Sequence, residues 1–378
     1  MKPTFVLALM LALAGCTAPG RSHVARVAHD EAAIAPAIER LMQRERVQGM
    51  AVAMIEDGKV SQVRAFGRRS ARPDQPLTIN TVMYGASLTK AAFSYMVLQL
   101  VDEGKLKLDT PIADLLPRPL PDYEGYADLK DDARWRLLTP RMLLNHSAGF
   151  ANFRWLEDDK HLQFHFTPGQ RYAYSGEGIN LLQLVLEQGL GLDVGKEMQL
   201  RLFDRFGLTR TSMRWRPDFA SELADGFDLH GATAPHDKRS KVRAAGSMDT
   251  TISDQARLWA AMMRGDGLSA ASRAEFVRPQ LAITTRYQFP TLRTEDDPRN
   301  AEIGLSSALG VIAFTDASGA AWYKGGHDDT TGNMVVCLEN GRRCAVLLAN
   351  DVRAELIYPE VVALILGETA MPWRWEYH

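Results

Sequence analysis

The spacing of apolar residues changes twice along the chain, from strand-like to helical and back to strand-like. Residues 51–55 and 60–66 are apolar runs joined by Asp57-Gly58, which predicts two strands connected by a tight turn. After Ser87 the spacing becomes helical, and Gly104 ends this helix. The apolar stripe of the predicted helix consists of Phe93, Met96, Val97, Leu100 and Val101.

The same criteria place the remaining elements. A short helix is predicted to begin at Thr139-Pro140, and longer ones at 179–190, 251–264 and 358–366. Strands are predicted at 308–314, 321–323, 334–338 and 344–348.

Strands at both chain ends, with helices between them, predict an α+β fold. We expect one antiparallel sheet built from both ends and flanked by helices. The domain should comprise 31–378, with an α/β part at about 31–86 and 251–378 and a mostly helical inserted part at about 87–250. An active site would lie in the cleft where the two parts meet.

The first residues form a separate segment with the features of an export signal. Lys2 precedes an apolar run at 5–14, which is too short to span a bilayer and is typical of a signal peptide. The run ends in Leu13-Ala14-Gly15-Cys16, which resembles the lipobox of bacterial lipoproteins. The alternative is a plain signal peptide with an incidental cysteine at this position.

The resemblance implies that residues 1–16 are a lipoprotein signal and that Cys16 carries the lipid. Residues 17–30, with Pro19 and Gly20, would then be a tether to the membrane. The expected location is the bacterial cell envelope, facing the periplasm. Thr17 follows the cysteine where an aspartate would favour inner-membrane retention, so the outer membrane is favoured.

Cys337 and Cys344 flank Asn340-Gly341, a strong signal for a two-residue hairpin turn. Such a turn places the two cysteines opposite each other on neighbouring strands. Disulfides persist outside the cytoplasm, so an exported chain is expected to form this one. Two free, buried thiols are the alternative.

Composition narrows the class of protein. The chain has 378 residues, of which 46% are hydrophobic, enough for a substantial core. The formal net charge is −2, which gives no electrostatic reason to expect nucleic acid as a partner.

Ser87-Leu88-Thr89-Lys90 opens the first long helix and carries the main chemical prediction. Residues three apart share a helix face, so the serine hydroxyl and the lysine amine should be neighbours. A lysine activates a serine only when burial or nearby positive charge lowers its pKa. Alone, Ser-x-x-Lys is a weak motif, because chance gives about one match in a chain of this length.

Two later segments strengthen the prediction. Tyr174-Ser175-Gly176 precedes a predicted helix, and His327-Asp328-Asp329 follows Lys324-Gly325-Gly326. In this order and spacing the chain resembles the class C β-lactamase and penicillin-binding serine hydrolase family, over about 35–370. That family carries Ser-x-x-Lys, then Tyr-x-Asn, then Lys-Thr-Gly or His-x-Gly.

The resemblance implies a role for each matching position. Ser87 would be acylated, while Lys90 and Tyr174 would share the proton transfers. The backbone N–H groups of Ser87 and Thr330 would form the oxyanion hole, and His327 would replace the lysine of the third motif. No cofactor or metal ion is expected, and the substrate would be a small-molecule or peptide acyl compound.

Departures from the family pattern bear on the substrate. Gly176 stands where many members have an asparagine that binds the acyl-amide arm of peptides and β-lactams. Asp328 and Asp329 place negative charge where a β-lactam carboxylate would lie, and like charges at about 4 Å repel by about 4 kcal/mol near a protein surface. An esterase or D-amino-acid peptidase with weak or no β-lactamase activity is therefore expected.

Other interpretations remain open. Asn145-His146-Ser147-Ala148-Gly149 comes close to the nucleophile elbow of α/β-hydrolases but lacks its first glycine. His161 and His165 have helical spacing for a zinc site, without a third ligand. The whole chain could also be a catalytically silent relative, a lipoprotein that binds cell-wall peptide or a partner.

Overall fold

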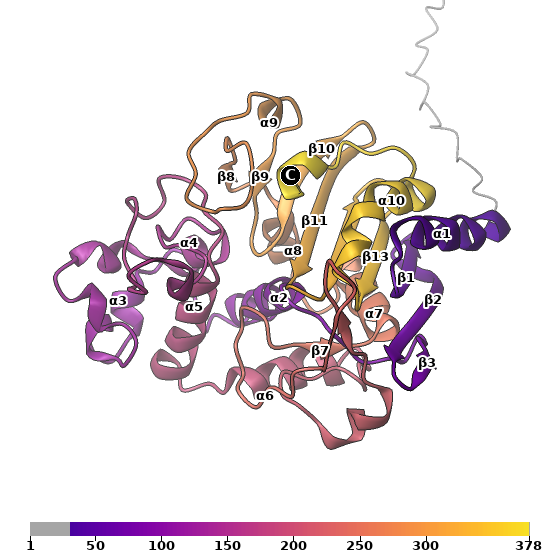
Figure 1. Ribbon diagram of the computed structural model, residues 1–378. Helices are drawn as coiled ribbons and strands as arrows, with labels where there is room; N and C mark the ends of the chain where they lie inside the picture. Colours follow the sequence, from indigo (N-terminus) through magenta and orange to yellow (C-terminus); the bar gives the residue numbers. More distant parts are fainter. Residues whose placement is uncertain (1–30, 378) are drawn as a thin grey trace, which may run out of the picture.

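The computed structural model describes residues 31–377. Its centre is an antiparallel sheet with the strand order β3-β2-β1-β13-β12-β11-β10-β9-β8 (Figure 1). The strands are β1 Gly49–Glu56, β2 Lys59–Ala71, β3 Asp74–Pro76, β8 Leu281–Ala282, β9 Ser306–Ser307, β10 Ile312–Asp316, β11 Gly319–His327, β12 Gly332–Leu338 and β13 Arg343–Ala349. Because β1 pairs with both β2 and β13, the two chain ends form one sheet, as predicted.

Helices cover both faces of the sheet, and a second group of helices lies beside it (Figure 1). Alternation along β1 sends Ala51 and Ala53 to one apolar core and Val52 and Met54 to the other, as expected for a sheet buried on both faces. The helices are α1 Glu31–Glu45, α2 Leu88–Asp102, α3 Ile112–Leu115, α4 Pro140–Leu144, α5 Gly176–Gly189, α6 Val194–Met198, α7 Ile252–Arg264, α8 Ala270–Val277, α9 Arg299–Glu302, α10 Tyr358–Leu366 and α11 Trp373–Glu376.

Short strand pairs join the two parts. β4 Met83–Tyr84 pairs with β7 Asp249–Thr250, and β5 Gly226–Phe227 pairs with β6 Thr233–Ala234. The first pair connects the segment just before Ser87 to the segment just before α7. Everything between these two points, including α2 to α6, forms the mostly helical insertion that the sequence predicts.

Helix α2 is buried on all sides. The sequence predicts an apolar stripe, but every residue from Leu88 to Leu100 is buried, including Lys90 and Gln99. A helix surrounded by protein is typical of a core position between layers. Figure 1 shows α2 beside the sheet, between it and the helices of the insertion. This position fixes the N-terminus of α2, where the partly buried Ser87 lies.

Two local predictions differ from the structure. α1 was not predicted, although Ile34, Ile38 and Met42 repeat every four residues and pack in the core that α10 also joins. The strand predicted at 308–314 begins only at Ile312, because Gly310 adopts a φ of +82° and turns the chain. In both cases the sequence holds a local signal, the apolar repeat of α1 and the glycine at 310, but this signal is weak.

The predicted disulfide is present between Cys337 on β12 and Cys344 on β13, with an S–S distance of 2.04 Å. The register also agrees, since Cys337 faces Cys344 and Leu338 faces Arg343. Both cysteines are fully buried in the core on the α2 side of the sheet. The bond therefore ties together the two central strands of the sheet.

Removing this disulfide should reduce stability modestly. The closed loop has only eight residues, so the chain-entropy model gives about 2.5 kcal/mol. Urea unfolding of the Cys337→Ala/Cys344→Ala variant should show this loss, and the variant should no longer respond to reductant. Equal stability of oxidised and reduced wild-type protein would contradict the prediction.

Predictions for the N-terminal segment stay predictions, because Cys16 and the tether 17–30 lie outside the described residues. Within 31–377, no helix combines the length and the apolar character that crossing a membrane requires.

Candidate active site

The predicted nucleophile and base meet at the start of α2. Lys90 Nζ lies 2.8 Å from Ser87 Oγ and donates a second hydrogen bond to the carbonyl of Ala245 at 2.6 Å. Ser87 is the N-cap of the helix, yet its hydroxyl makes no capping bond and faces the lysine instead. The preceding Ala86 has a φ of +45°, an uncommon conformation for alanine that marks a constrained turn.

Burial determines the charge state of Lys90. The side chain is 1% exposed, and this burial, together with the nearby charge of Lys324, holds its pKa well below the ordinary value. An ammonium group in such a place has lost its hydration without gaining a carboxylate. Lys90 can therefore be a neutral amine, which has the lone pair that a general base needs.

Tyr174 completes the group. It lies just before α5, whose N-cap Ser175 accepts a hydrogen bond from Gly178 N. Its ring lies 5.0 Å from Lys90 Nζ and 5.1 Å from Lys324 Nζ, measured to the ring centroid. Burial raises the pKa of Tyr174 far above the ordinary value, although a hydrogen bond with the Ser87 side chain opposes this. The hydroxyl thus stays protonated and can donate a proton.

The third motif is Lys324-Gly325-Gly326, and the prediction that His327 replaces its lysine is wrong. Lys324 Nζ donates to Tyr174 OH at 3.4 Å, and burial lowers the pKa of Lys324 to about 8. His327 Nδ1 instead lies 3.2 Å from Glu355 Oε1. Burial lowers the pKa of His327, but the Glu355 carboxylate raises it, and the net change is an increase. Side chains three apart on a strand point to opposite faces, so only one of the two can face Tyr174.

Strand β11 passes directly over the N-terminus of α2. A Cβ at Gly326 would lie 2.9 Å from Ser87 N and 3.0 Å from Leu88 N, so no larger residue fits here. The predicted oxyanion donor, Thr330, is placed differently. Its backbone N–H donates to Asp328 Oδ1 at 2.9 Å, within the turn that follows β11, which contradicts the expected role.

Gly176 is also explained by its surroundings. A Cβ there would come within 2.2 Å of the Phe153 ring, which fills the place next to the Tyr174-Ser175-Gly176 segment. Phe153 stacks on Trp155 at 4.1 Å between ring centroids, and Trp155 is 53% exposed. Where many members of the family have a polar asparagine amide, this chain has the aromatic ring of Phe153 next to Gly176.

His146 was missed as part of the site. It is buried behind Tyr174, with 4.4 Å between ring centroids, and its Nδ1 accepts a hydrogen bond from Ser175 N at 3.1 Å. Burial, followed by the charges of Lys90 and Lys324, keeps its pKa well below the ordinary value. The imidazole therefore supports Tyr174 as a neutral group. Its place after an asparagine gave no signal of this role.

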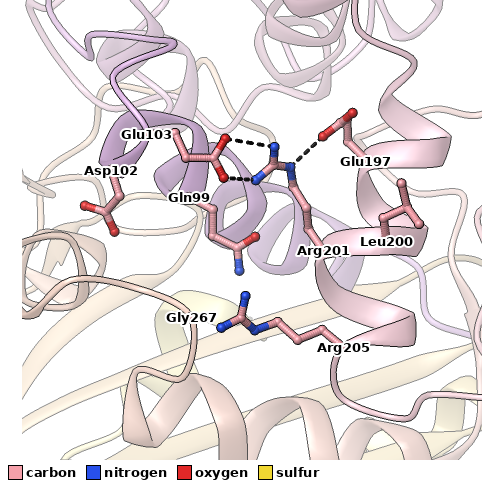
Figure 2. Close-up of a pocket in the computed structure, with 8 residues that line it drawn as sticks. All are labelled: Gln99, Asp102, Glu103, Glu197, Leu200, Arg201, Arg205 and Gly267. Atoms are coloured by element: carbon pink, nitrogen blue, oxygen red, sulfur yellow. Dashed lines mark hydrogen bonds and ion pairs between the residues drawn. The ribbon is translucent and has the colours of Figure 1, made fainter.

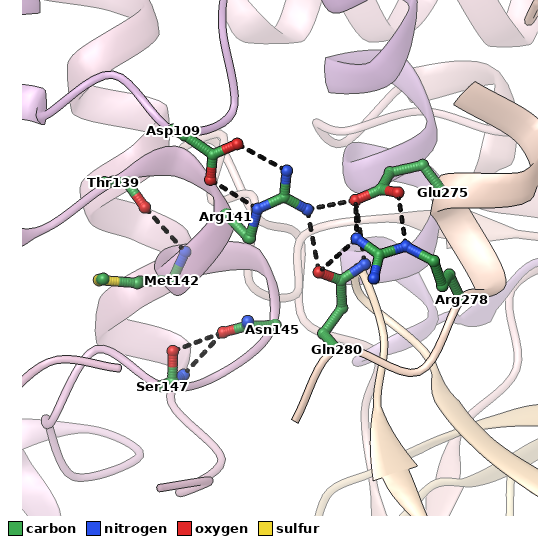
Figure 3. A network of polar contacts seen from close by, with 9 residues as sticks. All are labelled: Asp109, Thr139, Arg141, Met142, Asn145, Ser147, Glu275, Arg278 and Gln280. Carbon is green, nitrogen blue, oxygen red and sulfur yellow. Dashed lines mark hydrogen bonds and ion pairs between the residues drawn. The ribbon is translucent and has the colours of Figure 1, made fainter. Parts of the chain in front are cut away.

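The neighbouring Ser147 is not an alternative nucleophile in this structure. It is 1% exposed, and its hydroxyl donates to Asn145 Oδ1 at 2.6 Å (Figure 3). It follows helix α4, on which Arg141 forms ion pairs with Asp109 and Glu275. The segment is a structural turn rather than a nucleophile elbow.

The two histidines with helical spacing, His161 and His165, have separate partners. His161 Nδ1 lies 3.2 Å from Asp128 Oδ1, and His165 Nε2 lies 2.6 Å from Glu157 Oε1. Within residues 31–377, no group of three His, Cys, Asp or Glu side chains is arranged to hold a metal ion.

Asp328 and Asp329 line a pocket of about 280 Å³ together with Tyr84, His236 and Arg239. Tyr84 lies three residues before Ser87 in the chain, but Ser87, Lys90 and Tyr174 do not line this pocket. Another pocket, of about 390 Å³, lies at the opposite end of α2 (Figure 2). There Arg201 bridges Glu103 and Glu197, and no nucleophile lines the cavity.

Comparisons with known proteins identify the family of the chain. The Beta-lactamase family matches residues 34–360 of the chain. A beta-lactamase from Pseudomonas fluorescens is 26% identical over 204 residues, 51% of this chain, and the match spans 54% of that relative, about half of its length. A lovastatin esterase from Penicillium rubens is 30% identical over 311 residues, which cover 69% of this chain and 77% of the relative.

Solved structures show the same fold. The D-alanine carboxypeptidase AmpC from Burkholderia cenocepacia superimposes with a TM-score of 0.68 at 18% identity, over 88% of this chain and 97% of that one. The sheet built from both ends, the inserted helices and the family match over most of the sequence lead to one conclusion: the chain belongs to the Beta-lactamase family.

Proposed function

We propose that this protein is a serine acyl hydrolase that forms an acyl-enzyme at Ser87. The observation that carries the proposal is the 2.8 Å contact between Ser87 Oγ and the buried Lys90 Nζ. A serine beside a lysine of lowered pKa is an activated nucleophile. A catalytically silent relative would have no need of a buried lysine in this place.

Each step of the reaction has a group in reach. Neutral Lys90 takes the Ser87 proton as Oγ attacks the acyl carbon. The N–H groups of Ser87 and of His327, next to Gly326, are the donors that we assign to the oxyanion. Tyr174 gives its proton to the leaving group and is reprotonated through the lysines. In the second half a water molecule attacks the acyl carbon and gives a proton to Tyr174, while the Tyr174 proton passes through the lysines to Ser87 Oγ as its bond to the acyl carbon breaks.

We propose esters as the preferred substrates. Phe153 and Trp155 provide an apolar surface where an acyl-amide arm would need a polar partner. Asp328 and Asp329 disfavour a substrate carboxylate in the pocket that they line. The similarity to a lovastatin esterase supports the same choice. A D-amino-acid peptidase is the second possibility within this mechanism.

Short-chain aryl esters should be hydrolysed much faster than cephalosporins. We expect at least a 100-fold difference in kcat/KM, since repulsion of about 3–4 kcal/mol corresponds to a factor of 10² or more. Asp329→Gly should narrow this difference by increasing β-lactam acylation, with Glu339→Gln as a control for a carboxylate elsewhere. Efficient cephalosporin turnover by the wild type would refute the substrate assignment.

A further inference from the structure

Helix α11, at the C-terminus, brings a carboxylate into the core beside the active site. Glu376 is only 5% exposed, and its Oε2 accepts hydrogen bonds from Gln288 Nε2 at 2.6 Å and from Tyr323 OH at 3.2 Å. Both donors are neutral. A buried carboxylate with neutral partners still needs a positive charge nearby to offset its lost hydration.

Lys324, the residue before Gly325, supplies that charge, and it lowers the pKa of Glu376. A Cβ at Gly325 would lie 2.2 Å from Glu376 Oε1, so the carboxylate occupies the space that a side chain would take. Lys324 Nζ donates to the carbonyl of the same glycine. The carboxylate and the ammonium thus approach one peptide from two sides. The missing side chain at 325 is what permits this arrangement.

The active site contains two lysines and needs only one to be charged. Lys90 and Lys324 lie on the ring of Tyr174 at nearly equal distances. Two ammonium groups in so small a buried volume repel each other, so one is deprotonated first. A negative charge near one lysine and not the other decides which lysine this is. Glu376 lies against Gly325, the residue that follows Lys324.

We propose that Glu376 is a positioning residue, the counter-charge that keeps Lys324 an ammonium ion beside Tyr174 and leaves Lys90 as the neutral base. The inference rests on the proposed function and explains how its two lysines receive different roles. Glu376 touches neither Ser87 nor the position of a substrate acyl carbon, so it acts through Lys324.

Other ionisable groups also lie around Glu376. The His327 side chain, with its raised pKa, also acts on Glu376, and Glu355 lies close to His327. Four neighbouring tyrosines stay neutral because burial raises their pKa, namely Tyr172, Tyr174, Tyr323 and Tyr377. Burial raises the pKa of Glu376 and the Lys324 charge lowers it, with a net increase. Of these groups, only Lys324 is also bonded to Tyr174.

Glu376→Gln tests the proposal with little structural change, because an amide oxygen can accept both existing hydrogen bonds. The carboxylate raises the pKa of Lys324, so its removal should lower that pKa by about one unit. The alkaline limb of kcat/KM for an aryl ester should then move to lower pH by the same amount. Glu355→Gln, which removes the neighbouring carboxylate, should leave that limb unchanged.

Two further measurements separate this inference from the proposed function. NMR titration of side-chain-labelled lysines, with the Lys324 signal assigned through Lys324→Arg, should show the same shift without any substrate. Gly325→Ala should displace the Glu376 carboxylate and move the alkaline limb of kcat/KM to lower pH. The double variant Gly325→Ala/Glu376→Gln should show no additional shift. If a fluorophosphonate probe did not label Ser87 in the wild type, the proposed function would be refuted, but the NMR result on Lys324 would still stand.

The inference itself is overturned if Glu376→Gln leaves the Lys324 titration where it is. It is equally overturned if the variant loses activity by the same factor at every pH, because that pattern indicates a structural role only.

Discussion

Ser87→Ala is expected to abolish both turnover and covalent labelling by a fluorophosphonate probe. Without Ser87 Oγ no other group in the cluster can form the acyl-enzyme, since Tyr174 stays protonated and Lys90 is positioned as a base. Loss of a nucleophile in an acyl-enzyme mechanism lowers kcat by about 10⁵-fold or more. Labelling measured by intact mass, and hydrolysis of an aryl ester, would both report the change.

Ser147→Ala is the matched control for this variant. Ser147 is a buried serine near Tyr174, but its hydroxyl is bound to Asn145. Its replacement should leave labelling at Ser87 intact and affect stability only, by about 1 kcal/mol for the lost hydrogen bond. If Ser87→Ala retained labelling and Ser147→Ala lost it, the nucleophile would be Ser147.

Lys90→Met and Tyr174→Phe should each reduce kcat/KM by about 10³-fold, the usual contribution of a general acid or base. Methionine keeps the length of the buried side chain without an amine, and phenylalanine keeps the ring of Tyr174 without its hydroxyl. Because both residues serve one proton transfer, the double variant should be only slightly worse than either single one. Additive losses would show that they act in separate steps.

The pH dependence of the wild type follows from the same groups. Lys90 must be neutral to accept the Ser87 proton, and its pKa is held well below the ordinary value. Activity should therefore persist at neutral pH and fall as the pH drops through the lowered pKa of Lys90. Lys90→Met should flatten this acid limb in the remaining activity, which a pH profile of single-turnover acylation would show.

The sequence predicted the parts of the site that depend on local geometry. Ser87 and Lys90 are three apart on one helix, so their contact follows from helix periodicity alone. The overall fold followed from the order of strand and helix spacings, and the disulfide from a hairpin turn. These signals involve neighbours in sequence, where distance along the chain determines distance in space.

The third motif shows where this reasoning fails. Lys324 and His327 can both supply a basic side chain, and both follow Tyr174 at a suitable spacing. Only the face of β11 on which each lies decides between them, and strand register is set by pairing with β12 and by the approach of Gly326 to α2. The lysine before two glycines was the available signal.

Other features could not be inferred from one sequence. Phe153 reaches Gly176 from an irregular segment, so nothing in its local pattern indicates the contact. Glu376 lies 52 residues after Lys324, on a four-residue helix that ends the described chain. Such contacts depend on how loops fold back on the sheet, which short-range periodicity does not encode.

The sheet built from both ends of the chain also has a consequence for biosynthesis. Ser87 and Lys90 leave the ribosome long before β11 and β13, which follow about 240 residues later, or at least ten seconds at ordinary rates of synthesis. During that interval Lys90 is solvated, has an ordinary pKa and cannot activate the serine. The nucleophile therefore becomes reactive only when the last strands complete the sheet. An unfinished chain cannot react with acyl compounds inside the cell that synthesises it.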